Sequence, residues 1–251
     1  MSAMAIAWIV FACVFGGALL GVFLRSALPE QHLSGDTKDV VKVAMALIAT
    51  MSALVLSLLI SSAKSAYDTR SNELVQMSAD IVVLDRVLAR YGPEAKDARA
   101  LLRRSVAAGI ERFWPANGAQ AAAFNPTASS AEALYEKIDE LSPQSESQRS
   151  LQAQALKMAM DVGHTRFLLF EQADSSIPAP FLVVLVFWLT IIFASFGLFA
   201  PANTTATAAL LVCALSVSGA IFLIVELDRS FEGMIQVSGA PMRQALARLG
   251  Q

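Results

Sequence analysis

The residues that could most clearly do chemistry are small and hydroxylated side chains that recur at steps of three and four between positions 46 and 61. At this spacing they share one face of an α-helix. Hydroxyl groups on such a face could replace part of the hydration shell of an ion in a polar pathway. Small residues are equally the usual means by which membrane helices pack closely. Both readings stay open, and the candidates for lining a pathway are Thr50, Ala53, Ser57 and Ser61.

Charged residues crowd both ends of the same stretch. Basic residues there would attract anions at the two mouths of a pathway, and acidic residues would draw cations. A role as solvated charges at a membrane surface is an equal alternative. Because both signs occur, these residues decide no selectivity. The candidates for charges at a pore mouth are Lys42, Lys64, Asp36, Asp39 and Asp68.

A dense group of charges follows the last apolar run and comprises Glu226, Asp228 and Arg229. Charges at a membrane exit anchor a helix or pair with an opposing helix, for example through Lys64 or Arg70, so we interpret this group as a structural charge cluster. No HExxH, GxSxG or P-loop motif and no cluster of histidine and cysteine is present. We therefore predict no enzymatic activity, no catalytic residue, no metal site and no cofactor.

The small and hydroxylated residues lie in the uncharged run from Val43 to Ala63, which must position them. Lys42 and Lys64 enclose it, and their separation corresponds to about 33 Å of helix, close to the thickness of a bilayer core. Composition agrees, since hydrophobic residues make up 55% of the chain and charged residues 16%. These values are typical of an integral membrane protein. The net charge of −2 offers no basis for binding nucleic acid.

Three further apolar runs have the length of a membrane span. The predicted fold is therefore an all-α integral membrane protein with four transmembrane helices in two hairpins. A helical soluble insert lies between the second and third helices. After Lys64 no glycine or proline occurs before Gly92 and Pro93, so the second span is predicted to continue as an amphipathic stalk. The expected domains are residues 1–64 (helices about 3–24 and 40–63), the insert 65–177, residues 178–227 (helices about 181–199 and 205–225), and a tail, 228–251, with a short interfacial helix.

Two sequence blocks resemble a bacterial membrane-protein family that is commonly labelled bestrophin-like. The first runs from Leu24 to Asp68 and begins LRSALPEQHLS, and the second runs from Glu226 to Pro241 and reads ELDRSFEGMIQVSGAP. The resemblance implies a pentameric anion channel with four transmembrane helices per subunit, the second lining the pore. The bestrophin neck is built of bulky apolar and aromatic residues, whereas the face described above carries small and hydroxylated residues. The acidic calcium-binding sequence of bestrophins is not recognisable in this chain. The resemblance therefore implies neither chloride selectivity nor calcium dependence.

The location expected from four spans is the bacterial inner membrane, with both termini and the insert on one side. Basic residues near the membrane are nearly balanced between the two sides, and we expect the cytoplasm to be the side of the insert and termini.

Two functional hypotheses follow. The first is a homo-oligomeric ion channel that contacts the lipid bilayer and conducts inorganic ions, with anions expected from the resemblance. The second is a non-conducting membrane scaffold or sensor whose insert binds protein partners. The absence of ionisable residues within the spans is compatible with both hypotheses, because channels can be built without such residues.

Overall fold

The computed structural model describes residues 2–27, 35–114, 129–171, 178–201, 203–229 and 233–250. The described chain is helical and contains no strand, which confirms the predicted all-α class. Its elements are α1 (Ala3–Ala27), α2 (Gly35–Tyr91), the short 3-10 helix η2 (Pro93–Ala95), α3 (Lys96–Phe113), α4 (Ser129–Asp139), α5 (Glu146–Glu171), α6 (Ala179–Phe199), α7 (Thr204–Asp228) and α8 (Ala240–Arg248).

Four of these helices, α1, α2, α6 and α7, are long and apolar enough to cross a membrane. The predicted number of spanning helices is thereby confirmed. α2 is far longer than a bilayer requires, because its 57 residues correspond to about 85 Å of helix. It ends where the sequence predicts, at Gly92, whose φ of 137° favours glycine, and at Pro93, which cannot continue the hydrogen-bond ladder.

The chain divides into two compact units, and the boundary falls inside α2. The first unit comprises Met1–Ala66 and Ser175–Asp228, and the second comprises Tyr67–Asp174 and Arg229–Gln251. The tail therefore groups with the residues of the predicted insert.

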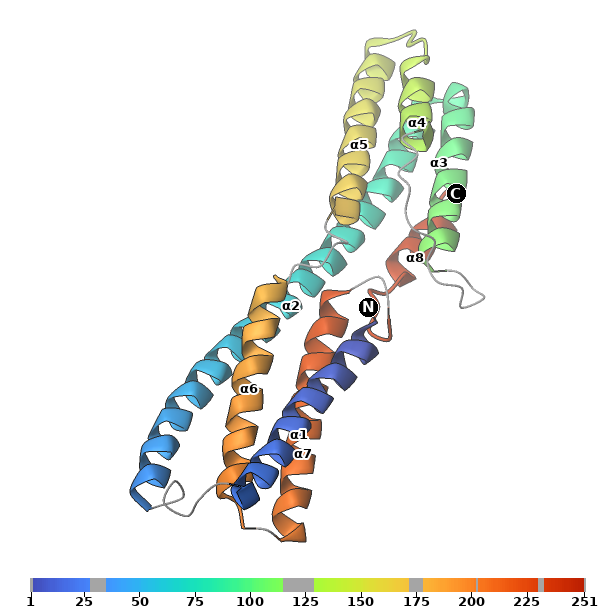
Figure 1. Cartoon of the computed structure of the whole chain (residues 1–251). Coiled ribbons are helices and arrows are strands. Elements are labelled where there is room, and N and C mark those ends of the chain that lie inside the picture. Colours follow the sequence, from blue (N-terminus) through green and yellow to red (C-terminus); the bar gives the residue numbers. More distant parts are fainter. Residues whose placement is uncertain are drawn as a thin grey trace. The chain divides into compact units, whose positions relative to one another are not determined.

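The first unit contains α1, α6, α7 and the amino-terminal part of α2, with α6 lying between α1 and α2 (Figure 1). Backbone contact joins α1 to α6. A Cβ atom added at Gly21 would collide with the carbonyl oxygen of Ala194, and one added at Gly197 would collide with that of Ala18. The structure places Gly17 and Gly21 against α6, whereas a Cβ at Gly16 would meet nothing within 4 Å.

The side chain of Arg25, in the last turn of α1, makes a hydrogen bond to the end of α6. Its Nη1 atom donates to the carbonyl oxygen of Ala200, which caps the carboxy-terminal end of α6. Carbonyl groups in the last turn of a helix lack partners within the helix, and a cation is favoured there. This contact therefore stabilises the end of α6.

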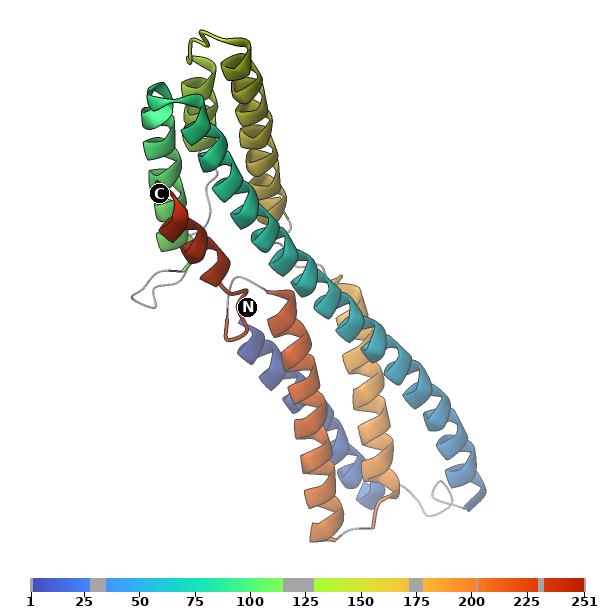
Figure 2. The same ribbon diagram turned by 180° about the vertical axis from the view of Figure 1, so that it is seen from behind.

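The second unit packs α3, α4, α5 and α8 around the carboxy-terminal half of α2 (Figure 2). Its most deeply buried large side chains are Leu84, Leu88, Ile138 and Val237. The first two come from α2, so the same helix that carries the apolar span also supplies the centre of a second hydrophobic core. The predicted stalk is thus one wall of a helical domain.

The tail packs into this second core. Met242, Ala245 and Leu249 on α8 and after it are buried, which gives the apolar side of α8 a protein partner where the sequence predicted a membrane interface. The indole Nε1 of Trp114 donates to the carbonyl oxygen of Val237 at 2.9 Å. These contacts join segments more than a hundred residues apart, which local periodicity does not report.

An ion pair between the buried Asp85 and the half-buried Arg99 completes the second unit. Arg99 donates from Nε and Nη2 to the two carboxylate oxygens of Asp85, each at 2.8 Å, and the backbone N–H of Gly250 donates to Asp85 at 3.2 Å. The two parallel bonds form the bidentate arrangement that suits a guanidinium group. Asp85 is only 3% exposed, so it links α2, α3 and the end of the chain inside the protein.

Candidate functional site

The predicted pathway residues lie on the surface of the first unit. Thr50, Ala53, Ser57 and Ser61 are all exposed in the single chain. The hydroxyl of Thr50 donates to the carbonyl oxygen of Ala46 at 2.5 Å, which leaves the lone pairs of its oxygen directed outward. We call these four residues the small face of α2.

The opposite side of α2 makes the contacts with the rest of the unit. Ser52, Leu59 and Ala63 are buried, and Val55 and Leu56 are half-buried in the same apolar core. At about 100° per residue, Ser52 and Leu59 stand nearly half a turn from Ser57. α2 therefore packs by one side, and the small face points away from its own subunit.

Ser52 is a hydroxylated residue of the same helix that the predicted pathway face does not include. It is 4% exposed, and its hydroxyl donates to the carbonyl oxygen of Ile48 at 2.8 Å. This bond satisfies the buried hydroxyl within its own helix. Its position two residues from Thr50 was the available signal, because residues two apart lie on different sides of a helix.

Large apolar side chains flank the small face. Leu54 is 70% exposed, and Val43, Leu47, Met51 and Leu58 are also exposed. Within the single chain they contact little protein. In a bilayer such side chains are accommodated by lipid or by another copy of the chain.

The candidate mouth charges have different surroundings. Lys42 Nζ lies 3.1 Å from Asp39 Oδ1, and both side chains are exposed, so this pair compensates its own charge locally. Lys64 is exposed and Asp68 is half-buried. Asp36 belongs to α2, but its side chain lies outside the described residues. By helical spacing Asp39 and Lys64 fall on the same side of α2 as Ser57.

The predicted charge cluster is largely internal. Glu226 and Asp228 are 3% and 2% exposed at the end of α7, and Arg229 is half-buried. Both carboxylates interact with other groups. Buried charges require such compensation, and removing it is costly. The burial supports a structural role for the cluster.

A metal centre finds no support in the described part of the chain, which contains no group of three His, Cys, Asp or Glu side chains close enough to hold an ion. Sequence reasoning missed a cavity in the second unit, which is lined partly by Arg112 and Arg166. Neither arginine belongs to a motif, and only the placement of α3 and α5 on either side of the cavity brings them together.

Comparison with solved structures finds a likeness to a point mutant of a bacterial bestrophin homolog from Klebsiella pneumoniae. The TM-score is 0.63 at 15% sequence identity, over 94% of this chain and 96% of the other. At that identity the likeness shows a shared fold. No curated protein matches the chain. The family model of the Bestrophin-like domain matches residues 12–242, nearly the whole chain. Together with its four apolar helices, this match shows that the chain is a membrane protein of the Bestrophin-like family.

Proposed function

We propose that this protein is a homo-oligomeric ion channel in which the small face of α2 from each subunit lines a shared pathway. The observation that carries the proposal is the orientation of α2. The side formed by Ser52 and Leu59 packs against the subunit, and the side formed by Thr50 and Ser57 is exposed. Copies arranged around an axis would enclose that second side, and family membership favours such an assembly. The expected number of subunits is five, by resemblance.

The chemistry of the small face suits transient contact with a partly hydrated ion. Hydroxyl groups both donate and accept hydrogen bonds, so a ring of them can replace some of the water around an ion. Thr50 donates to its own helix and thus offers acceptor lone pairs to the pathway. An anion would require that hydroxyl to turn its hydrogen outward. Lys64, on the same side of α2, would favour anions at one mouth.

The proposed location is the bacterial inner membrane, with both termini and the second unit in the cytoplasm. The exposed apolar side chains of α2 would then contact lipid or neighbouring subunits.

A non-conducting scaffold or sensor is the second candidate. The observation that favours it is the folded second unit, which has its own hydrophobic core and its own cavity. A sensor needs a domain that can bind something without the membrane part, and this unit has the required internal space.

Ion flux into liposomes that contain the purified protein tests the channel, with anions and cations compared. Ser57→Trp places a bulky side chain on the small face, and we expect it to abolish flux. Val212→Trp is the matched control, because Val212 is an exposed residue of α7, and it should leave flux unchanged. A strictly monomeric protein, or equal flux from both variants, would contradict the proposal. Absence of flux from folded oligomers with either ion type would favour the scaffold.

A further inference from the structure

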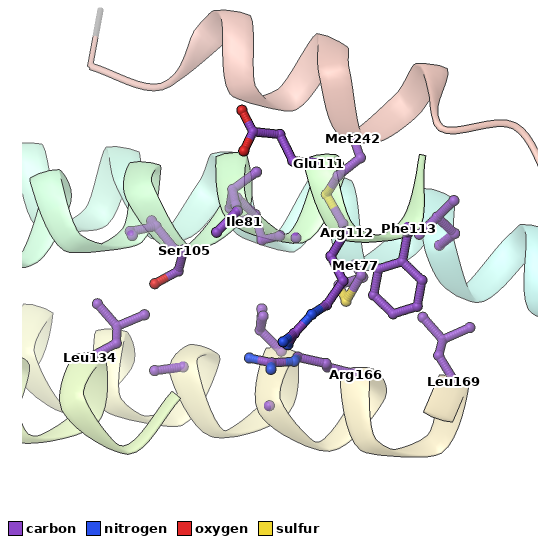
Figure 3. A pocket seen from close by; sticks show the side chains of 18 of the residues that line it. Met77, Ile81, Ser105, Glu111, Arg112, Phe113, Leu134, Arg166, Leu169 and Met242 are labelled. Atoms are coloured by element: carbon purple, nitrogen blue, oxygen red, sulfur yellow. The ribbon is translucent and has the colours of Figure 1, made fainter. Parts of the chain in front are cut away.

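The second unit contains a cavity of about 610 Å³ between α3 and α5 (Figure 3). Its walls are mainly apolar and include Met77 and Ile81 of α2 and Val162 of α5, while Met242 of α8 lies at its border. The volume falls in the range of sites that bind small molecules. An apolar cavity of this size favours a ligand with an apolar body.

Two arginines bring positive charge into the same cavity. Figure 3 shows the side chains of Arg112 from α3 and Arg166 from α5 extending toward each other until their guanidinium groups are neighbours. Burial, and next the charge of Arg112, lower the pKa of Arg166. The guanidinium group of Arg166 nevertheless stays protonated at neutral pH. The carboxylate of Glu111 also borders the cavity, but Figure 3 shows it directed away from the two guanidinium groups.

Like charges repel each other strongly where the surroundings are apolar. An anion placed between the two guanidinium groups would turn this repulsion into two charge-assisted contacts. The pair of arginines thus selects the sign of the ligand's charge, and the apolar walls select the character of its remainder.

Two glycines keep the cavity wide. Gly109 of α3 and Gly163 of α5 line it, and a Cβ atom added at either would meet nothing within 4 Å. Glycine within a helix destabilises that helix relative to alanine. At Gly21 and Gly197 of the first unit, close helix packing explains the glycine, since an added Cβ atom would collide with the backbone of the neighbouring helix. At Gly109 and Gly163 the missing side chains provide open space instead.

We propose that this cavity binds an amphipathic anion, a molecule with one carboxylate or phosphate head and an unbranched apolar chain. The head lies between Arg112 and Arg166, and the chain lies against the apolar walls of α2 and α5. The site is separate from the small face of α2, and its occupancy is measured by binding, so the result does not depend on ion conduction.

Fluorescence of Trp114, which lines the cavity, provides the readout. The chain has three tryptophans, and Trp8→Phe with Trp188→Phe leaves Trp114 alone. This protein, in nanodiscs of zwitterionic lipid, is titrated with ω-bromoundecanoate, whose bromine quenches a nearby indole. We expect saturable quenching that unbrominated undecanoate or undecyl phosphate reverses and that undecyltrimethylammonium does not. The stronger competitor of the first two identifies the head group.

Variants then locate the site. Arg112→Gln and Arg166→Gln should each weaken binding at least about tenfold, since each removes a charge-assisted contact. Gly163→Leu should abolish binding by filling the cavity, with helix content and melting temperature retained. Arg104→Gln is the matched control, because Arg104 is an exposed residue of α3 that does not line the cavity. Quenching that does not saturate, that the cationic analogue reverses equally, or that the three cavity variants leave unchanged would overturn the proposal and indicate partition into lipid.

Discussion

At the scale of single residues, the surroundings of a buried carboxylate decide its role in this protein. Asp85 accepts three hydrogen bonds from Arg99 and Gly250. Burial alone would raise the pKa of its carboxyl, but the bonds from Arg99 and Gly250 and the charge of Arg99 outweigh this effect and lower it. Asp85 lies well beyond Ala63, where the uncharged part of α2 ends. It is therefore a structural anchor of the second unit.

Asp85→Asn is expected to destabilise the second unit. The amide cannot carry the charge that both arms of Arg99 contact, so about 2 kcal/mol of stability should be lost. The measurement is the thermal unfolding of the purified protein, followed by circular dichroism. Asp161→Asn, which alters an exposed carboxylate of α5, is the control and should leave the melting temperature nearly unchanged.

The ion pair between Asp85 and Arg99 should make the stability of the folded protein depend on pH. Because the pKa of Asp85 is lower in the folded than in the unfolded protein, its stabilising contribution is complete above the unfolded value of about 4. It is lost as the pH falls through the lower, folded value. Melting temperatures of the wild type and Asp85→Asn, compared from about pH 7 downward, should converge below about pH 4. A gap that stays constant throughout this range would refute the assignment.

At the scale of elements, two sets of helix glycines have different surroundings that sequence alone does not distinguish. Those of the α1–α6 contact permit two backbones to touch, and those of α3 and α5 border open space. In a membrane, where apolar surfaces gain little from leaving lipid, close backbone packing supplies much of the attraction between helices. The α1–α6 contact is thus the part of the first unit that should tolerate added atoms least.

Gly21→Ala should separate α1 from α6, because its Cβ would strike the carbonyl oxygen of Ala194. Overpacking of this kind costs roughly 1–3 kcal/mol. Gly16→Ala makes the same chemical change on the same helix without a contact, and it should stabilise the protein by about 0.5–1 kcal/mol. Thermal unfolding in one detergent compares the two. Equal effects would show that helix propensity, and not packing, governs α1.

At the scale of the whole molecule, the chain forms a membrane unit and a helical unit, and α2 contributes residues to both. The membrane unit leaves the small face of α2 exposed, so assembly with further copies is the natural way to enclose it. The second unit is completed by residues from the carboxy-terminal tail. A truncation before α8 would therefore open the core of the second unit.

Assembly around the small face predicts which residues approach their counterparts in other subunits. In a background with Cys13→Ala and Cys213→Ala, Ser57→Cys should be linked between subunits by a short thiol-reactive cross-linker. Ser52→Cys should not be linked, because Ser52 is buried within its own subunit. Non-reducing gel electrophoresis separates the products. If Ser52→Cys gave linked subunits and Ser57→Cys did not, the axis of the assembly would lie on the side of α2 opposite the small face. That result would contradict the proposal.

The sequence by itself determined the elements of this protein. Uncharged runs of spanning length predicted the four apolar helices, and the absence of glycine and proline between Lys64 and Gly92 predicted the unbroken α2. These features are local, since a helix and its apolar length depend on residues close together in the chain. Spacing also grouped the residues of the small face.

Only the tertiary structure decided what those elements contact. It placed Ser52 inside the subunit and Ser57 outside, and it packed α8 into the second core. It also joined Asp85 to Arg99 and Gly250 and brought Arg112 beside Arg166. Each of these outcomes depends on which helices pack together. That choice rests on the fit of whole surfaces contributed by distant segments, and the period of a single helix is the same whichever partner it meets.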